Sequence, residues 1–311
     1  MNKKKMIYLI IFIAIIIILI FVFNNPFKQD KILRDENGYI IENNDVYEIN
    51  NAIRNNDYKA IKNKINKTNI NQLPYKKGQY KLLDDSDPDY EDRYRNSPPL
   101  IEACAFGHYD IIKLLLDNGA DINIKEENSS NTPLMYLFEN QDRNENTYKI
   151  TKLLLEQYKE HNFNKELEAF IDSSYALDNK NSGKNINLNI FKLLYETNSK
   201  NIESYSNIQK GELLTKAATT NNLSILKYLL EEKKYDVNLQ SENGDTALIS
   251  ATYMDRIDIV KYLLSMNADK TIKNDRNKIA LDYAKEPITI HSGGKDYVYG
   301  ENNDELIKIL Q

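Results

Sequence analysis

The stretch SPPLIEACAFGHYDIIKLLLDNGADIN, residues 97–123, decides the fold of this 311-residue chain. Its apolar residues recur at three- and four-residue spacing in two segments of roughly ten residues, which predicts two short amphipathic helices. Gly107 falls where the first helix must stop, in a position suited to a left-handed backbone. Pro99 suits the first turn of a helix, where no backbone donor is needed. The stretch therefore predicts a pair of antiparallel helices joined by a tight turn.

The same pattern returns along the chain at a nearly constant distance. Thr132 and Pro133 begin a further copy 34 positions after Pro98, and residues 244–269, GDTALISATYMDRIDIVKYLLSMNAD, match as clearly as the first stretch. Asn56 and Asn221 stand where Gly107 stands in the first copy, and Asn is the next best residue for a left-handed backbone. A regular period of this length indicates a stacked repeat architecture.

The pattern resembles the ankyrin repeat, whose T-P-L-H-x-A-A, G-H, I-V-x-L-L-L and G-A-D-V-N elements have counterparts here. The family spacing of about 33 residues also holds. Because one unit cannot bury its own apolar face, the resemblance implies an all-α solenoid of stacked helix-turn-helix units, with His108 tying neighbouring turns together. The positions that match structural elements of the family are Pro99, Gly107, His108, Gly119, Thr132, Pro133, Gly244 and Thr246.

We expect about seven units, some of them degenerate, within residues 45–311. The long interval between the copies at Thr132 and near residue 212 predicts one degenerate repeat, with helices near residues 167–176 and 189–197. Residues 303–310 read as a polar-faced cap, which the end of a solenoid requires. A short hairpin is expected between residues 289–290 and 297–298. Inserts are expected near residues 72–96, 141–147, 178–188 and 287–300.

The amino terminus differs from the rest of the chain. Residues 6–23, MIYLIIFIAIIIILIFVF, carry no charge, and as a helix they would be about 27 Å long, close to the thickness of the bilayer core. The basic tail of residues 1–5 and this run predict a transmembrane signal anchor, followed by a polar tether over residues 24–44. A cleaved signal peptide is the first alternative, although its apolar region would be shorter and end in small residues. The clustered lysines favour an inner amino terminus and an extracytoplasmic repeat domain.

Composition excludes several classes of protein. The single cysteine cannot form an internal disulfide, and three histidines with one cysteine leave too few soft ligands for a zinc cluster. The net charge is −5, and without the three lysines of the basic tail it is −8, which argues against binding to nucleic acid phosphates. Heavy use of Asn, Ile, Lys and Tyr is typical of an AT-rich genome and favours a low-GC bacterium as the source of this chain, which with the predicted anchor suggests a membrane-anchored bacterial protein.

Few residues suggest a catalytic, phosphate-binding or metal-binding site. Cys104 lies on an apolar helix position and reads as an inert thiol, while His161 and His291 are expected to be isolated and exposed. Residues 292–295, SGGK, lack the spacing of a phosphate-binding loop. The acidic insert supplies weak metal candidates in a calcium-loop-like alternation, but Tyr90 stands where the turn glycine belongs. These candidates are Asp85, Asp87 and Asp89.

The resemblance implies a non-enzymatic scaffold, without catalytic residues or cofactor, that binds a partner protein through a concave groove and the turn fingers. Exposed aromatic side chains or Met in that groove would be anchors. Two alternatives stay open: a stabiliser or immunity factor for an envelope enzyme or toxin, and a calcium-responsive domain that uses the acidic insert. No nucleic acid or small-molecule substrate is expected. The candidate partner-binding residues are Ala105, Phe106, Tyr253, Met254, Asn274, Arg276, Tyr90 and Tyr94.

Overall fold

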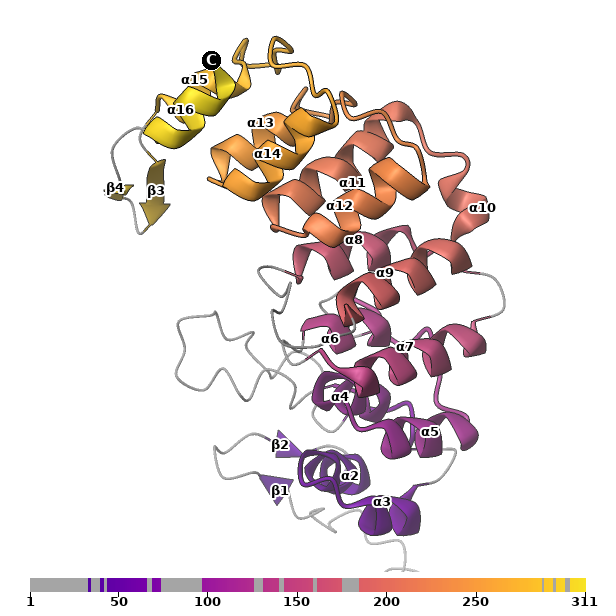
Figure 1. Cartoon of the computed structure of the whole chain (residues 1–311). Coiled ribbons are helices and arrows are strands. Elements are labelled where there is room, and N and C mark those ends of the chain that lie inside the picture. Colours follow the sequence, from indigo (N-terminus) through magenta and orange to yellow (C-terminus); the bar gives the residue numbers. More distant parts are fainter. Residues whose placement is uncertain are drawn as a thin grey trace, which may run out of the picture.

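The computed structural model is a stack of helix pairs that follows an arc, from α2 and α3 at the bottom of Figure 1 to α15 and α16 at its top. It describes residues 33–34, 40–41, 44–65, 69–73, 97–125, 131–139, 143–158, 161–174, 185–286, 288–292, 295–299 and 303–311. Within these residues the expected count of seven units is confirmed, because seven helix pairs follow one another along the chain. Residues 6–23 lie outside them, and no helix of the described part is long and apolar enough to cross a membrane.

Each unit contributes one helix to an inner row and one to an outer row. The first helices are α2 (Asn44–Arg54), α4 (Pro99–Phe106), α6 (Pro133–Glu139), α8 (Asn164–Asp172), α11 (Asn207–Thr219), α13 (Ala247–Tyr253) and α15 (Ala280–Ala284). The second helices are α3 (Tyr58–Lys64), α5 (Tyr109–Asp117), α7 (Glu145–Gln157), α9 (Ile186–Thr197), α12 (Leu223–Lys227) with its π-helical continuation η2 (Tyr228–Glu232), α14 (Ile257–Ser265) and α16 (Asp304–Leu310). Every first helix packs on the first helix of the next unit.

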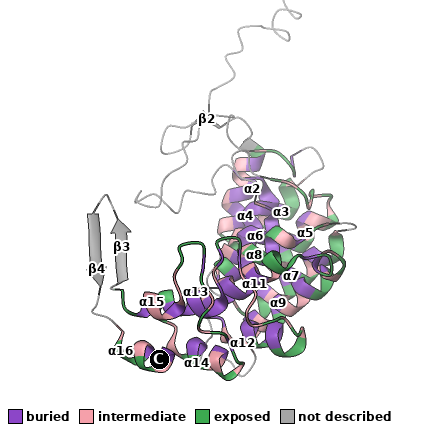
Figure 2. Cartoon of the chain, turned by 90° about the horizontal axis from the view of Figure 1, so that it is seen from above, coloured by how far each residue is buried: buried purple, intermediate pink, exposed green. Residues whose placement is uncertain are grey.

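A continuous core lies between the two rows of helices. The first helices carry mostly buried residues, as Figure 2 shows, whereas the second helices bury one face and expose the other. Complete burial of one Leu or Ile side chain contributes about 1.5–3 kcal/mol, so the stacked leucines and isoleucines supply the main stabilisation. Side chains that are at most 1% exposed come from all parts of the stack and include Ile49, Leu100, Ile111, Ile150, Leu194, Leu213 and Leu263.

In four units, the turn between the paired helices contains one residue with a left-handed backbone. Gly107 has a left-handed backbone with φ 68°, and Asn56 and Asn221 take the same conformation with φ 53° and 61°, as the sequence predicts. Asp255 occupies the equivalent place in the sixth unit with φ 59°, although nothing in the sequence pattern pointed to it. After each of these residues, the next N–H bonds back to the carbonyl of a buried alanine in the first helix, as His108 does to Ala103. A small side chain is needed there because neighbouring helices lie close together.

The third and fourth units close their first helices differently, through Arg143. Its guanidinium donates to the carbonyl oxygen of Phe138 in α6 at 2.9 Å and of Phe170 in α8 at 3.4 Å. It also donates to the hydroxyls of Ser173 and Ser174 at 2.6 and 2.5 Å, and it stacks 4.4 Å from the Phe170 ring. Burial lowers its pKa to about 10, so the group remains charged at neutral pH. One side chain thus caps two helices whose carbonyls have no intrahelical partner.

Several predicted boundaries need correction. The degenerate unit exists, but α8 ends at Asp172 instead of near residue 176. Residues 145–147 and 186–188, expected within inserts, are first turns of α7 and α9. The side-chain oxygens of Asn144 and Asn185 accept backbone N–H bonds at these helix starts, and such capping stabilises a helix there.

Two antiparallel strand pairs accompany the helices in the described residues. The predicted hairpin is confirmed, because β3 (Ile288–Ser292) pairs with β4 (Lys295–Tyr299) between α15 and α16. A second, unexpected pair is formed by β1 (Leu33–Arg34) and β2 (Ile40–Ile41), within the segment read as a polar tether. A short helix, α10 (Ser199–Ile202), also interrupts the connection between α9 and α11. The all-α class therefore holds for the solenoid itself, with strands only as additions.

The second helix of the fifth unit contains one residue more than those of the second and sixth units. Leu230 and Asp236 are six positions apart, whereas the matching leucine and aspartate are five apart in the second and sixth units. η2 absorbs the extra residue, because the Lys233 N–H donates to the Tyr228 carbonyl five positions back. Lys234 then takes the left-handed backbone, φ 57°, where other units have Gly or Asn. A π-helical turn of this kind often marks a functional site.

Candidate functional site

The inner side of the arc presents the ends of the first helices, where two large side chains are exposed. Phe106 at the end of α4 is 38% exposed, and Tyr253 at the end of α13 is 55% exposed. Ala105 and Met254 beside them are half-buried. Phe106 and Tyr253 belong to the second and sixth units, so the structure does not bring the predicted groove residues together into one patch (Figure 1).

The sixth and seventh units hold a connected group around Tyr283, which the sequence reasoning missed. The Tyr253 and Tyr283 rings meet edge to face at 5.5 Å. The Asn274 amide donates to the Tyr283 hydroxyl at 2.8 Å, and Asn274 Oδ1 accepts the N–H of Arg276 at 3.1 Å. Arg276 itself is exposed on the finger between α14 and α15. We call Tyr253, Tyr283, Asn274 and Arg276 the carboxyl-terminal cluster.

Asn274 is not an exposed contact residue, contrary to the expectation from the sequence. It is only 7% exposed, and its amide also donates to Asp245 Oδ1 at 2.7 Å. Its oxygen accepts a second backbone N–H, from Lys278, at 3.1 Å. Because all of these bonds stay within the chain, Asn274 holds the finger in shape and leaves Tyr253 and Arg276 to face outward.

The fingers are tied to one another as well as to their helices. The Gln240 amide donates to the Gly244 carbonyl at 2.6 Å and to the Lys273 carbonyl of the next finger at 3.1 Å. Gly244 has a left-handed backbone, φ 73°, and Thr246 caps α13 by accepting the Ile249 N–H. Because hydrogen bonds join neighbouring fingers, the shape of this surface is largely fixed before a partner binds, which reduces the entropy lost on binding.

The remaining structural positions agree with the pattern. Pro99 and Pro133 stand in the first turns of α4 and α6, and both are buried. Gly119 has a left-handed backbone with φ 90° after α5. The His108 ring stacks on Phe106 with centroids 6.0 Å apart, and burial lowers its pKa, opposed by a hydrogen bond with the Ile53 backbone of the previous unit. His108 thus joins two neighbouring turns.

Two side chains of reactive types, Cys104 and His161, are both held by contacts within the chain. Cys104 is completely buried, and burial raises the pKa of its thiol, so it stays protonated. His161 is not isolated, as the sequence suggested, because its Nε2 lies 3.0 Å from Glu166 Oε1. The Thr132 hydroxyl donates to the same oxygen at 3.0 Å. Since the carboxylate stands between the hydroxyl and the imidazole, the histidine cannot take the proton of Thr132, and the arrangement joins two units without activating a nucleophile.

The calcium-like acidic insert lies outside the described residues. This applies to Asp85, Asp87 and Asp89 and to the two tyrosines predicted as partner contacts, Tyr90 and Tyr94. Within the part of the chain that the structure does describe, no group of three or more His, Cys, Asp or Glu side chains could hold a metal ion.

Comparison with known proteins agrees with this architecture. A family model described as ankyrin repeats (3 copies) matches residues 49–166 and 181–274. Alpha-latrotoxin-Lg1a of Latrodectus geometricus is 29% identical over 195 residues, which are 62% of this chain and 13% of that protein. Putative ankyrin repeat protein L91 of Acanthamoeba polyphaga mimivirus is 30% identical over 58% of this chain and 24% of that protein. The chain thus spans less than a quarter of the length of these relatives.

A solved structure shows the same fold. The ankyrin repeat domain of human ASB11 superposes with a TM-score of 0.55 at 17% identity, covering 85% of this chain and 97% of that domain. The family model covers well over half of the chain, and seven helix pairs follow one another along the described residues. The chain belongs to the ankyrin repeat family.

Proposed function

We propose that this protein is a non-enzymatic scaffold that binds a partner protein along the inner side of its arc, with the carboxyl-terminal cluster as the main anchor. Ankyrin repeat domains generally mediate protein–protein interaction. The observation that carries the proposal is the exposure of Tyr253, 55%, on a support that internal hydrogen bonds hold fixed. Large aromatic side chains and Arg dominate the binding energy of protein interfaces, and this cluster presents one of each.

A photo-crosslinking experiment tests the anchor. A photoreactive amino acid placed at Met254, which adjoins the cluster, should capture the partner in cells, and replacing Tyr253 by Ala should reduce the captured amount about tenfold or more. Tyr58→Ala is a matched control, because Tyr58 is also an exposed tyrosine, 41%, but lies on the outer helix α3. Equal capture by the wild-type protein and both variants would contradict the proposed anchor, and so would a loss caused by Tyr58→Ala alone.

We further propose that residues 6–23 tether the scaffold to a membrane, with the repeats on the extracytoplasmic side. The support comes from the sequence, an uncharged run of 18 residues behind three lysines. The buried position of Cys104 makes a labelling test clean, because the one native thiol is shielded. A cysteine introduced at exposed Glu242 should react with a membrane-impermeant maleimide on intact cells. Reaction only after the cells are opened would reverse the proposed topology.

A further inference from the structure

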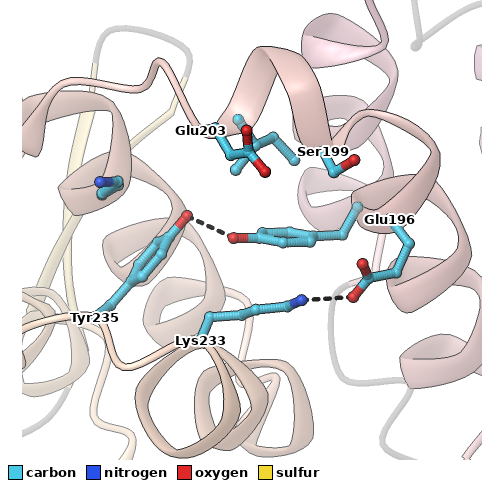
Figure 3. A pocket seen from close by; sticks show the side chains of 8 residues that line it. Glu196, Ser199, Glu203, Lys233 and Tyr235 are labelled. Carbon is cyan, nitrogen blue, oxygen red and sulfur yellow. Dashed lines mark hydrogen bonds and ion pairs between the residues drawn. The ribbon is translucent and has the colours of Figure 1, made fainter.

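A pocket of about 380 Å³ lies between the fourth and fifth units, away from the inner side of the arc. Figure 3 shows it from close by, enclosed by α9, α10, the start of α11 and the segment after η2. The short helix α10 contributes one wall, and the segment that directly follows the π-helical turn contributes another. The lining residues are Tyr195, Glu196, Ser199, Ile202, Glu203, Lys210, Lys233 and Tyr235.

The base of the pocket is held by hydrogen bonds between its own side chains. The hydroxyls of Tyr195 and Tyr235 are 3.0 Å apart, and Lys233 Nζ donates to Glu196 Oε1 at 2.5 Å. The Tyr228 hydroxyl donates to the same carboxylate oxygen at 2.6 Å, and the Lys233 ammonium lies 4.8 Å from the centre of the Tyr195 ring. Lys233 and Glu196 therefore neutralise each other and fix the tyrosine pair.

Two charged side chains at the walls remain outside this network. Glu203, directly after α10, lies across the pocket from Lys233, as Figure 3 shows, and it forms no ion pair among the described residues. Lys210 on α11 lies over the Tyr235 ring at 5.7 Å and likewise forms no ion pair there. The pocket thus combines a carboxylate on one wall, an ammonium group on another, and two tyrosine hydroxyls between them.

The one-residue insertion shapes the wall of this pocket that follows η2. Without it, the second helix would end as in the sixth unit, one position earlier, and the side chains after it would change their direction. The left-handed backbone of Lys234 costs about 1 kcal/mol relative to Gly. Strain of this kind is typical of sites where the backbone is shaped for a ligand.

We propose that this pocket binds a small zwitterion, a free amino acid or a dipeptide, with its ammonium group at Glu203 and its carboxylate at Lys210. A sphere of the pocket's volume is about 9 Å across, the span of two to three extended residues at about 3.4 Å each. Because the lining has two lysines and two glutamates, a ligand with a single charge meets attraction and repulsion together. A zwitterion satisfies both free groups, while Ile202 and the tyrosine rings contact its apolar part.

Titration calorimetry on the detergent-solubilised full-length chain tests the proposal. The probes are the twenty L-amino acids and their glycyl dipeptides at millimolar concentration, each compared with its amide and with its N-acetyl derivative. At least one free zwitterion should bind, and its singly charged derivatives should bind about tenfold more weakly, since each loses one charge-assisted hydrogen bond. Failure of every probe to bind, or equal binding of a zwitterion and its amide, would overturn the proposal.

Two variants that each remove one charge test whether the probe binds in this pocket. Glu203→Gln and Lys210→Gln should each weaken the best probe about tenfold or more, because the neutral amide keeps the size of the side chain or nearly so but loses its charge. Neither side chain forms a described ion pair, so both variants should keep the wild-type melting temperature. Lys200→Gln and Glu242→Gln are matched controls at exposed positions outside the lining, and they should bind as the wild type does. Undiminished binding by both pocket variants would place the ligand elsewhere and refute this site.

Discussion

Replacing Gly211 by Ala should destabilise the protein, although the same change would stabilise an isolated helix. Gly211 lies within α11, where Ala is preferred to Gly by about 1 kcal/mol. A Cβ atom at this position would stand 2.2 Å from the carbonyl oxygen and 2.5 Å from the carbonyl carbon of Gln240, both in the backbone of the next finger. Helix propensity and packing therefore predict opposite signs.

The magnitude follows from the displacement that the new atom requires. Ordinary contact begins near 3.4 Å, so the finger would have to retreat by 3.4 − 2.2 = 1.2 Å. That movement strains the two bonds that the Gln240 amide donates, to Gly244 and to Lys273. Overpacking costs about 1–3 kcal/mol, and each weakened hydrogen bond about 1 kcal/mol. After the gain in helix propensity, we expect a net loss of about 2 kcal/mol.

Urea unfolding followed by circular dichroism measures the loss, and hydrogen exchange locates it. In Gly211→Ala, amides of residues 236–246 should exchange faster while those of the first three units keep their protection, because each unit contacts only its neighbours. Gly119→Ala is the comparison, since a Cβ there meets no atom within 4 Å and only the positive φ opposes it. If Gly211→Ala leaves both stability and finger exchange unchanged, the close contact between α11 and this finger does not exist.

Three further outcomes are expected. Lys234→Gly should stabilise the protein by about 0.5–1 kcal/mol in urea unfolding, because relief of left-handed strain outweighs the added freedom of the unfolded chain. Thr132→Val should cost about 1–2 kcal/mol in the same measurement, since buried Glu166 loses a hydrogen-bond donor, whereas Thr132→Ser should cost less. The hydrogen bond from Lys233 lowers the pKa of Glu196 below its ordinary value of 4.5, so its stabilisation is present above that pH and is lost as the pH falls. Melting curves of Glu196→Gln should therefore change less than those of the wild type between pH 5 and about pH 3.

Much of the solenoid could be predicted from the sequence because its local signals repeat. Leucines and isoleucines at helical spacing predict the helix pairs, and Gly107, Asn56 and Asn221 predict the turns, all of which the structure confirms. Asp255 was missed because Asp takes a left-handed backbone less often than Gly or Asn, and the turn is imposed by the packed helices on either side. At Asp255, tertiary packing imposes a backbone conformation that the residue itself does not favour.

The candidate site was less predictable, because exposure depends on partners distant in the sequence. Tyr253 is exposed as expected, but Asn274 is buried by bonds to residues 29 positions before it and 9 positions after it. Only the alignment of two fingers brings these groups together. His161 illustrates the same limit, since its partner Glu166 is positioned by the start of α8, whose weak pattern gave no exact boundary.

The position of the proposed pocket follows from how a solenoid distributes its stability. Each unit contacts only its neighbours, so an insertion in one connection costs energy at that junction and leaves the other interfaces intact. The extra residue in η2 and the extra helix α10 can therefore persist beside the regular units. A globular core would spread the same disturbance through its packing. Deleting Lys234 should therefore restore a regular α-helical end to the fifth unit, abolish zwitterion binding and leave the carboxyl-terminal cluster able to bind its partner. Loss of both activities would show that the two sites are not independent.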